Sequence, residues 1–532
     1  MLEQNYLYKG TSTLKNKYGI KDPKKLYERC TQDAAREAVN FRLEPPPQKF
    51  DASYLQLIHW CFFHKTFEWA GHFRDTSFTF EDGTSARMPA MRPKGYEIPF
   101  TIGPKIQKEL KQLEKILHEK NNLKDLSRQE FAENAAEIFM ILERIHPFRK
   151  GNGRVNRMFM EKLGQAAGHQ IDFSFITKER MTAASIEAIQ YGNPQPMKDL
   201  FEDITHPKKS LVLKEFVSQM RSAGLNEINN RVVVAAKEDV LYEGIFKGFS
   251  AEGFVIEING AFVVGLKDDL SPDQIKTLQN GARICFQKTN VQNLKEILIP
   301  KETLAPLSQE ELFARITNDP CVEECRKKIE NLSKVVYRKA QILKTKIDII
   351  TADPSLGNQF ADEILQNPQS ISKLVGRKIF GIKSSNRRHA EQTAPQLSET
   401  LRNYATITHQ TKDEILERHQ REKNRLSHNI ETPGKNLQNL FALSVEQQKE
   451  SLLRSPALRQ ELHDFSRRLQ NRLSSEDRKA IQEKDHLRLA CLLGISESKA
   501  KEIAHIVKQT KEAQCQARSL KVSRSSSLAL TG

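Results

Sequence analysis

The chain is 532 residues long, which exceeds what one ordinary hydrophobic core supports, so we expect two to four domains. Hydrophobic residues make up 38% of the chain and charged residues 28%, and no stretch approaches the roughly 20 apolar residues that a membrane span requires. The first ten residues, MLEQNYLYKG, lack the basic-then-apolar layout of a secretory signal. This composition argues against an integral membrane protein, and any export would have to use another signal.

The net charge of +16 points to a polyanionic partner such as a nucleotide, a nucleic acid, an anionic membrane or an acidic receptor. A solvated lysine-rich surface is the alternative interpretation, because charged stretches are more often solvated faces than binding sites. The seven cysteines are odd in number and scattered. We interpret them as reduced thiols in cytosol-like surroundings, and not as a disulfide framework or a zinc site.

Two helices around one loop form the clearest pattern in the first two fifths of the chain. The run SRQE at residues 127–130 predicts a capping box at a helix start, and apolar residues then recur at helical spacing. Proline disfavours helical backbone in the residue before it, so this helix should end at His146, which precedes Pro147. A tight turn at residues 151–153 then leads into the second helix. We therefore expect His146 in a loop between two core helices.

The chain changes character after about residue 232. Short β-rich runs extend to about residue 287, and the pair Asn259-Gly260 between two apolar runs predicts a β-hairpin, so we expect a small barrel or sheet. From about residue 302 onward the chain is long, polar and helical in its periodicity. After Glu512 the chain is Ser-rich and holds basic residues without an acid, so we expect disorder there.

The run HPFRKGNGRVNR, residues 146–157, carries the chemistry. A glycine-flanked turn that feeds a helix N-terminus presents unpaired amides and the positive end of the helix dipole, and both suit a phosphate. The two glycines let the backbone approach that phosphate, two arginines three residues apart can face it, and the histidine can take a proton near neutrality. These residues are His146, Gly151, Gly153, Arg154 and Arg157.

A satisfied loop histidine and a plain Asn-Gly turn are the simpler interpretation of either feature alone. The conjunction is more specific, because the histidine, the glycines and the arginines all have to fall at set offsets. Together they predict a nucleotide phosphate site with a base beside it.

The same run resembles the signature of the Fic family, HPF-x-(D/E)-GNGR-x-x-R, and FEWAGHFRD at residues 67–75 looks like the aromatic strip before that family's flap. The similarity extends over roughly residues 15–207. It implies an all-helical domain with a β-hairpin flap at about residues 78–100, which docks a target segment by strand addition. It also implies transfer of AMP from ATP to a Ser, Thr or Tyr hydroxyl of a target protein.

The resemblance assigns roles to single residues. It implies that His146 is the general base, that Phe148 anchors the loop in the core, and that Asn152 with the glycine amides holds the α- and β-phosphates. The two arginines would bind the outer phosphates. The nucleotide-binding set is then Lys150, Gly151, Asn152, Gly153, Arg154 and Arg157, and the residues near the flap tip are Met91, Arg92 and Lys94.

Lys150 departs from the family pattern, because it stands where the family has the Asp or Glu that holds Mg²⁺. Two unit charges about 4 Å apart interact by roughly 4 kcal/mol at an effective dielectric near 20, so an ammonium replaces attraction for a divalent ion with repulsion. Mg²⁺ is therefore doubtful in its usual place, whereas the ammonium can still neutralise a phosphate. We therefore expect that replacing the acid with Lys150 impairs catalysis more than it impairs ATP binding.

The family's inhibitory helix carries (S/T)-x-x-x-E-(G/N), and its glutamate competes for the second arginine. We find no such motif before or just after the Fic-like region. Either a separate small inhibitory protein supplies the inhibitory glutamate, or a weakly active site needs no inhibition.

The rest of the chain resembles the Bartonella effector proteins. The β-rich middle is similar to their OB-fold, and GRKIFGIKSSNRRHAE at residues 376–391 is similar to the core of their BID domain. In that family this domain, with its basic tail, is the signal for type IV secretion from the bacterial cytoplasm into the host cytoplasm. The resemblance therefore implies that the coupling protein of the secretion machine is a partner. The resemblance implies that Arg518, Lys521 and Arg524 belong to the secretion signal.

We therefore expect a mainly α chain. Its predicted parts are a Fic domain at 1–207 with its core at about 15–207, a linker at 208–231, an OB-like β-barrel at 232–300, an elongated helical BID bundle at 301–512 and a disordered basic tail at 513–532.

Two hypotheses of function remain from the sequence. The first is an enzyme that transfers AMP to a host protein. The second is a catalytically impaired adaptor that recruits a host protein and so affects Rho GTPase and actin signalling. In either case the host protein is expected to be a Rho-family GTPase or one of its regulators. DNA is not an expected partner, because residues 254–264 lack exposed aromatics interleaved with Lys and Arg.

Overall fold

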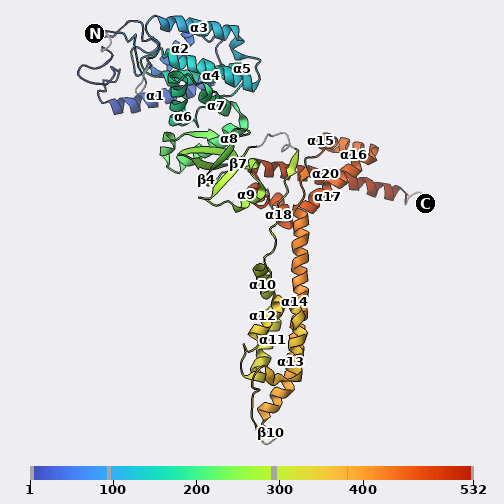
Figure 1. Ribbon diagram of the computed structural model, residues 1–532. Coiled ribbons are helices and arrows are strands. Elements are labelled where there is room, and N and C mark those ends of the chain that lie inside the picture. Colours follow the sequence, from blue (N-terminus) through green and yellow to red (C-terminus); the bar gives the residue numbers. More distant parts are fainter. Residues whose placement is uncertain (1–4, 93–97, 289–295, 380, 529–532) are drawn as a thin grey trace. The chain divides into compact units, whose positions relative to one another are not determined.

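The computed structural model describes residues 5–92, 98–288, 296–379 and 381–528, the last ten of them by their backbone alone (Figure 1). The chain divides into two compact units, Met1–Gln292 with His486–Lys501, and Asn293–Asp485 with Glu502–Gly532. No helix within these described ranges has both the length and the apolar character that crossing a membrane requires. All seven cysteines are free thiols.

The first unit begins with a helical part built on one core. Ser127 accepts a hydrogen bond from the Glu130 N–H, and the Glu130 carboxylate accepts one from the Ser127 N–H, which confirms the predicted capping box. The helix then ends before His146, as predicted. The helices of this part are α1 (Pro23–Leu43), α2 (Ala52–Phe63), α3 (Lys105–Glu119), α4 (Arg128–Ile145), α5 (Asn152–Ala167), α6 (Lys178–Gln190), α7 (Gln195–Thr205) and α8 (Pro207–Ser222), and a short hairpin joins β1 (Phe78–Thr79) to β2 (Ser85–Ala86).

The segment 208–231, expected as a linker, is instead mostly helix α8, and this helix is part of the core. Val212 and Phe216 are buried, in the same cluster as Val255 and Val264 of the following sheet. The apolar residues fall on one side of the helix, and burying them requires the sheet as a partner. The helical part and the sheet therefore share one core.

A five-stranded sheet follows α8. Positive φ angles of 50° at Asn259 and 81° at Gly260 join two strands in the predicted hairpin. One isolated bridge links Glu238 to Lys288, but the outer strands form no ladder with each other within the described residues, so the expected barrel is an open sheet there. The strands are β3 (Val233–Ala235), β4 (Leu241–Phe249), β5 (Gly253–Ile258), β6 (Ala261–Leu266) and β7 (Arg283–Gln287), in the order β3-β6-β5-β4-β7, with only β3 and β6 parallel.

Three further helical segments belong to the first unit: α9 (Pro272–Thr277), α19 (His486–Leu493) and the first residues of α20 (Glu497–Leu528). The Ser498 N–H and hydroxyl donate to the Glu252 carboxylate over 2.8 and 2.6 Å. A segment far along the chain therefore completes this unit.

The second unit is helical and is built along α14 (Ser385–Leu426), which has 42 residues. Leu397 and Leu401 on this helix share a buried core with Ile329 and Ile364. The other elements are β8 (Ile297–Ile299), α10 (Gln309–Thr317), α11 (Pro320–Tyr337), α12 (Lys344–Ala352), α13 (Gly357–Gln366), β9 (Lys378–Ile379), β10 (Ile382–Lys383), β11 (Ile430–Glu431), α15 (Lys435–Phe441), α16 (Val445–Arg454), α17 (Pro456–Arg472) and α18 (Ser475–Glu483).

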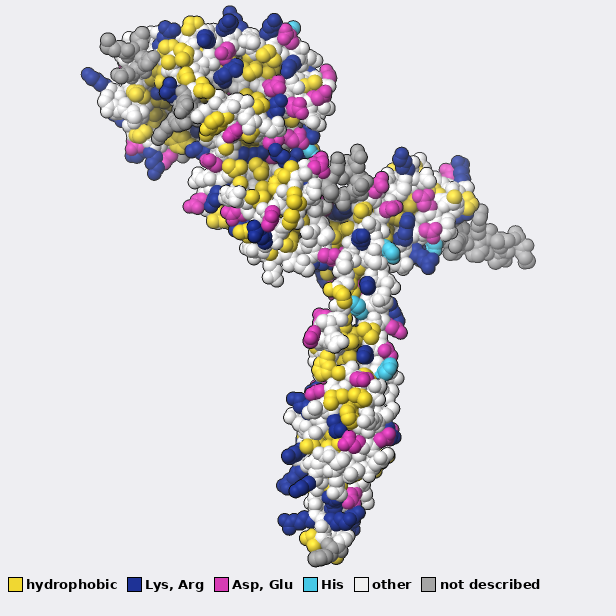
Figure 2. Space-filling view, in the orientation of Figure 1, with side chains coloured by type: hydrophobic (Ala, Val, Ile, Leu, Met, Phe, Trp, Pro, Cys, Tyr) yellow, Lys and Arg dark blue, Asp and Glu magenta, His cyan; other side chains and the backbone are white. Residues whose placement is uncertain are grey.

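The BID-like run at residues 376–391 contains the β9–β10 hairpin and the start of α14. Figure 2 shows Lys and Arg side chains gathered around this hairpin. Arg377, Lys378 and Arg388 are exposed there. Part of the chain's positive charge is thus concentrated on one end of the second unit.

The tail differs from its prediction, because α20 continues to Leu528 and Ala513 is fully buried. Disorder was expected from the Ser-rich, acid-free composition, but Ala, Gln and Leu in this stretch have good helix propensity and extend an existing helix. Arg518 is exposed on α20, and Lys521 and Arg524 follow on the same helix. Residues 529–532 lie outside the described residues.

Candidate functional site

His146 lies where α4 ends, with left-handed backbone at φ 48°. The following residue, Pro147, disfavours continuation of the helix. The His146 ring stacks on Phe100, with centroids 3.8 Å apart and planes 6° apart. Its carbonyl accepts a hydrogen bond from Arg74 Nε over 2.8 Å. Both the ring and the backbone of His146 are therefore fixed.

The surroundings keep the His146 imidazole neutral at pH 7. Burial is the main cause that lowers its pKa to about 3, and the positive charges of Arg74 and Lys150 lower it further, whereas the Glu143 carbonyl acts in the opposite direction. A neutral ring can accept a proton from a reacting hydroxyl. The side chain is therefore in the state that a general base requires.

Gly151 is the N-cap residue of α5 and has φ 94°, and a Cβ there would lie 2.4 Å from a carbon of the Phe63 ring. Both conditions require glycine. The N–H groups of Arg154 and Val155 donate to the Gly151 carbonyl over 3.0 and 3.2 Å. The amides that precede them have no acceptor within the helix, so this end of α5 can donate to an anion.

The side chain of Asn152 binds the backbone of its own loop. Its Oδ1 accepts from the Phe148 N–H over 2.9 Å, and its Nδ2 donates to the Phe148 carbonyl over 2.7 Å. Both residues are buried. The Asn152 side chain therefore holds the loop closed around Phe148 in the core, and its backbone N–H lies at the N-terminal end of α5, which can donate to an anion.

His59 is a loop-positioning residue that the sequence analysis missed. Its Nδ1 accepts from the Gly71 N–H over 2.7 Å, so its Nε2 carries the proton and donates to the Lys150 carbonyl over 3.0 Å. The ring also stacks on Phe148 at 4.0 Å. In the sequence it is one polar residue within the apolar run of α2, and that is the only signal that could have indicated it.

Two arginines face the loop from α5. Arg154 Nη2 donates to the Thr31 hydroxyl over 2.8 Å. Burial lowers the pKa of Arg157, and the charges of Glu143 and Arg154 act on it in opposite directions. Beside them, a Cβ on Gly153 would meet only Arg157 Nη1, at 3.5 Å, so the space in front of Gly153 is open.

One cavity of about 560 Å³ brings most of the predicted residues together. Lys150, which is exposed, lies at its edge. The predicted residues that line the cavity are Met91, His146, Lys150, Gly151, Asn152, Gly153, Arg154 and Arg157.

The described lining of this cavity offers a divalent cation no carboxylate, and it carries four cationic side chains: Arg149, Lys150, Arg154 and Arg157. Nor do His, Cys, Asp and Glu form a group of three suited to a metal elsewhere in the described residues. Mg²⁺ prefers carboxylate and phosphate oxygens. These residues fit an anion and do not fit Mg²⁺.

The predicted flap is short in its regular part. The β1–β2 hairpin covers Phe78 to Ala86, and the Phe100 N–H then donates to the Met91 carbonyl over 3.0 Å. Of the three predicted docking residues, Met91 lines the cavity and Arg92 is exposed. The third, Lys94, lies outside the described residues.

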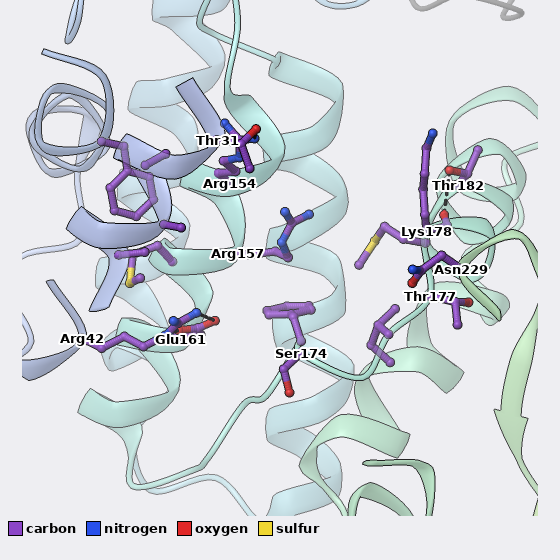
Figure 3. A pocket seen from close by; sticks show the side chains of 18 residues that line it. Thr31, Arg42, Arg154, Arg157, Glu161, Ser174, Thr177, Lys178, Thr182 and Asn229 are labelled. Carbon is purple, nitrogen blue, oxygen red and sulfur yellow. Dashed lines mark hydrogen bonds and ion pairs between the residues drawn. The ribbon is translucent and has the colours of Figure 1, made fainter. Parts of the chain in front are cut away.

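A second cavity, of about 590 Å³, lies between α1, α5 and the start of α6 (Figure 3). It shares Arg154 and Arg157 with the first cavity, and Figure 3 shows Arg157 pointing into it. Arg42 and Glu161 form a two-point ion pair on its wall, at 2.7 and 3.1 Å. Arg157 can therefore be reached from two sides.

The fold and this site define a helical domain with a cationic cavity, suited to an anion, beside a neutral histidine. The Fic/DOC family model matches residues 49–163, and a model described as an intracellular delivery domain matches residues 234–286. The second match falls on the five-stranded sheet, whereas the sequence analysis assigned delivery to the helical segment that follows it.

A protein adenylyltransferase of Bartonella henselae is 42% identical over 526 residues, which cover 99% of this chain and 96% of that protein. The solved structure of the type IV secretion system effector protein BepA is 46% identical, covers 54% of this chain and 97% of its own, and has a TM-score of 0.52. A structure of the BepC protein from Bartonella tribocorum with bound AMPPNP is 82% identical, covers 39% of this chain and 98% of its own, and has a TM-score of 0.38. The chain belongs to the Fic/DOC family, among the Bartonella effector proteins.

Proposed function

We propose that the protein transfers AMP from ATP to a Ser, Thr or Tyr hydroxyl of a host protein. One observation carries this proposal: a neutral His146, the residues at the start of α5, and Arg154 and Arg157 all line one cavity. The membership in a family with relatives named protein adenylyltransferase supports it.

The reaction needs one base and one anion site. The target hydroxyl oxygen attacks the α-phosphorus of ATP, and His146 takes the hydroxyl proton. The bond from the α-phosphorus to the bridging oxygen of the β-phosphate breaks, and pyrophosphate leaves. The α5 amides and the two arginines hold the phosphates and stabilise the charge that develops on them.

Lys150 supplies charge where a metal ion would otherwise act. An exposed ammonium at the edge of the cavity attracts the phosphates, but it does not impose the octahedral geometry of Mg²⁺ on them. The His59 hydrogen bond fixes the Lys150 backbone and leaves its side chain free to reach a phosphate. Transfer is therefore expected to be slow and independent of added Mg²⁺.

The test uses the purified chain, host-cell lysate and ATP labelled at the α-phosphate. We expect label on a host protein, no label with His146→Ala, and more label in the presence of Mg²⁺ with Lys150→Glu. Lys124→Glu is the matched control, because Lys124 is also exposed but does not line the cavity. Label that persists in His146→Ala would contradict the proposal.

Lys150 also favours a second candidate, a catalytically impaired adaptor that binds a host protein through the same domain. In that case the native chain transfers no label, and a host protein is retained equally by the native chain and by His146→Ala. The target class that the family resemblance offers is a Rho-family GTPase or a regulator of such GTPases.

A separate small inhibitory protein would reach Arg157 through the second cavity (Figure 3). Its glutamate would pair with this guanidinium and compete with the outer phosphates of ATP. A helical peptide with the (S/T)-x-x-x-E-(G/N) motif should then weaken AMPPNP binding. The same peptide with Gln in place of Glu should have no effect, and equal effects of both peptides would exclude this role.

The chain would enter the host cytoplasm through a type IV secretion machine, with the coupling protein of that machine as partner. The relation to BepA, named a type IV secretion system effector, supports this route. The signal would lie in the second unit and on α20 at Arg518, Lys521 and Arg524.

A further inference from the structure

Arg74 is a buried cation whose side chain donates only to backbone carbonyls among the described residues. It has no exposed surface. Its Nη1 donates to the carbonyls of Met88 and Pro89 over 3.0 and 2.9 Å, its Nη2 to the Thr101 carbonyl over 2.6 Å, and its Nε to the His146 carbonyl over 2.8 Å. One guanidinium therefore holds three separate stretches of chain.

Two of these stretches lie at the two ends of residues 88–101, of which the structure describes 88–92 and 98–101. These two described ends are called the segment below. The Met88 N–H donates back to the Arg74 carbonyl over 2.7 Å, and the Thr101 N–H donates to the Arg144 carbonyl in the last turn of α4 over 3.0 Å. Phe100, next to Thr101, stacks on the His146 ring. The segment is thus attached to His146 through both its backbone and its ring.

The chemistry of arginine suits this place. A guanidinium has five N–H donors in a planar fork, so it can bind several carbonyls in different directions, whereas an ammonium has three donors on one atom. Burial lowers the pKa of Arg74 to about 10, so the side chain remains protonated at neutral pH. Its charge also acts on the His146 imidazole and favours the neutral ring.

We propose that Arg74 is a positioning residue that couples the segment, residues 88–92 and 98–101, to His146, so that a displacement of one is transmitted to the other. If the protein transfers AMP as proposed above, a target strand seated beside Met91 then acts on the position of the base. The coupling itself is a property of the folded chain, and it can be tested without any transfer reaction.

The experiment is amide hydrogen exchange on the full chain with Arg74→Lys. We expect exchange at least tenfold faster both at the ends of the segment, residues 88–92 and 98–103, and in the loop at 145–148, with α7 unchanged. Arg180→Lys is the matched control. Arg180 is also buried, and among the described residues its guanidinium donates to the Asp199 carbonyl over 3.4 Å and pairs with the Asp203 carboxylate over 2.7 Å, both on α7.

Phe100→Leu provides a second variant if Arg74→Lys fails to fold. It removes the ring stack from the segment side, and it should also raise exchange in the loop at 145–148. Faster exchange confined to the segment in both variants would overturn the coupling. The coupling would also be overturned if exchange became uniformly faster across the helical part in both variants, by the same factor as in Arg180→Lys.

The same variants distinguish positioning from nucleotide binding. AMPPNP affinity should change by less than about threefold in Arg74→Lys, because the α5 amides, Arg154 and Arg157 are untouched. Where the native chain transfers AMP, its rate constant should fall at least tenfold. A native chain without transfer leaves the exchange test intact, so failure of the proposed function and failure of the coupling are separate results.

Discussion

At the scale of single residues, the two glycines of the loop predict opposite effects on stability. Gly151→Ala places a Cβ 2.4 Å from the Phe63 ring at a φ of 94°. Left-handed backbone alone costs an alanine about 1–2 kcal/mol, and the clash adds to it. We expect a loss of at least about 2 kcal/mol in the free energy of unfolding. Tryptophan fluorescence measures it in the first unit, because Trp60 and Trp69 are the two tryptophans of the chain.

Gly153→Ala is the matched variant, because this glycine lies inside α5 and a Cβ there makes only an ordinary contact at 3.5 Å. Alanine in place of a helical glycine adds about 0.5–1 kcal/mol of stability. The added methyl group nevertheless occupies the open space in front of the helix end. We expect a more stable protein that binds AMPPNP at least tenfold more weakly by calorimetry, and unchanged affinity would place the phosphates elsewhere.

His59 predicts a loss of stability in acid. Its pKa is lowered from 6.5 to about 3, chiefly by burial, so the unfolded chain binds a proton more readily than the folded one. The contribution of the neutral ring to the free energy of unfolding is fully present above pH 6.5, and it is lost as the pH falls toward 3. At pH 5 the loss is about 2 kcal/mol, taking 1.36 kcal/mol per unit.

The measurement compares the native chain with His59→Gln in urea at pH 7 and pH 5. The difference in unfolding free energy between the two proteins should shrink by about 2 kcal/mol on going to pH 5. His146 titrates in both proteins and cancels. His118→Gln, at an exposed position on α3, should leave the difference between the two pH values unchanged. If the difference in unfolding free energy between the native chain and His59→Gln is the same at pH 7 and pH 5, the His59 ring does not stay neutral in the folded chain.

The sequence indicated His146, the glycines and the two arginines because each has a local reason to be where it is. Arg74 and His59 could not be assigned roles in the same way. Arg74 has a partner 72 residues away in the chain and His59 has one 91 residues away, and both of these distant partners are backbone carbonyls that carry no side-chain signature. The contacts of the Asn152 side chain with the Phe148 backbone were not predicted either, and its part in holding phosphates stays a prediction.

At the scale of elements, α8 predicts that the helical part and the sheet are stabilised together. Phe216 is 5% exposed and packs edge-on against Phe262 of β6, with ring centroids 5.6 Å apart. Phe216→Ala should therefore cost about 3–5 kcal/mol in unfolding free energy. Leu211→Ala on the same helix, at an exposed position, should cost no more than about 0.5 kcal/mol.

Hydrogen exchange shows where that energy is lost. The amides of β6 and of α7 should both exchange faster in Phe216→Ala, because α8 packs against both elements. If exchange becomes faster in the sheet alone, α8 does not couple the sheet to the helical part, and residues 208–231 would act as the linker that the sequence predicted.

Elements with local signals were predictable, and elements that depend on a partner were not. The capping box of α4, its end before Pro147 and the Asn259-Gly260 turn each follow from a few neighbouring residues. The burial of α8 depends instead on a sheet that comes later in the chain. The five-stranded sheet was predicted as β-structure, but its openness depends on long-range pairing that periodicity does not report.

At the scale of the whole molecule, family and composition together define an effector with a Fic domain, a sheet and a basic helical unit. The charge of +16 does not require one polyanionic partner, because its basic residues occur in different places. Arg154 and Arg157 face a cavity in the first unit, whereas Arg377, Lys378 and Arg388 are exposed in the second. The first group fits the phosphates of the proposed function, and the second group fits an acidic partner.

The last prediction concerns delivery, and the structure changes how it must be tested. Ala513 is buried, so removal of every residue after Glu512 takes away part of the core and would confuse misfolding with loss of a signal. Removal after Arg518 spares that contact. We expect the shorter deletion to keep the melting temperature of the second unit within about 2 °C, which corresponds to less than about 1 kcal/mol for a unit of this size.

Charge can then be separated from length by substitution in the full chain. Arg518→Glu, Lys521→Glu and Arg524→Glu together should abolish transfer of a fused reporter into recipient cells, because an acidic partner would repel the changed helix. The matched triple variant that exchanges Arg and Lys at the same positions keeps the charge and should be delivered normally. Equal delivery of both variants would show that the signal lies elsewhere, and the sheet matched by the intracellular delivery model would then be the next segment to test.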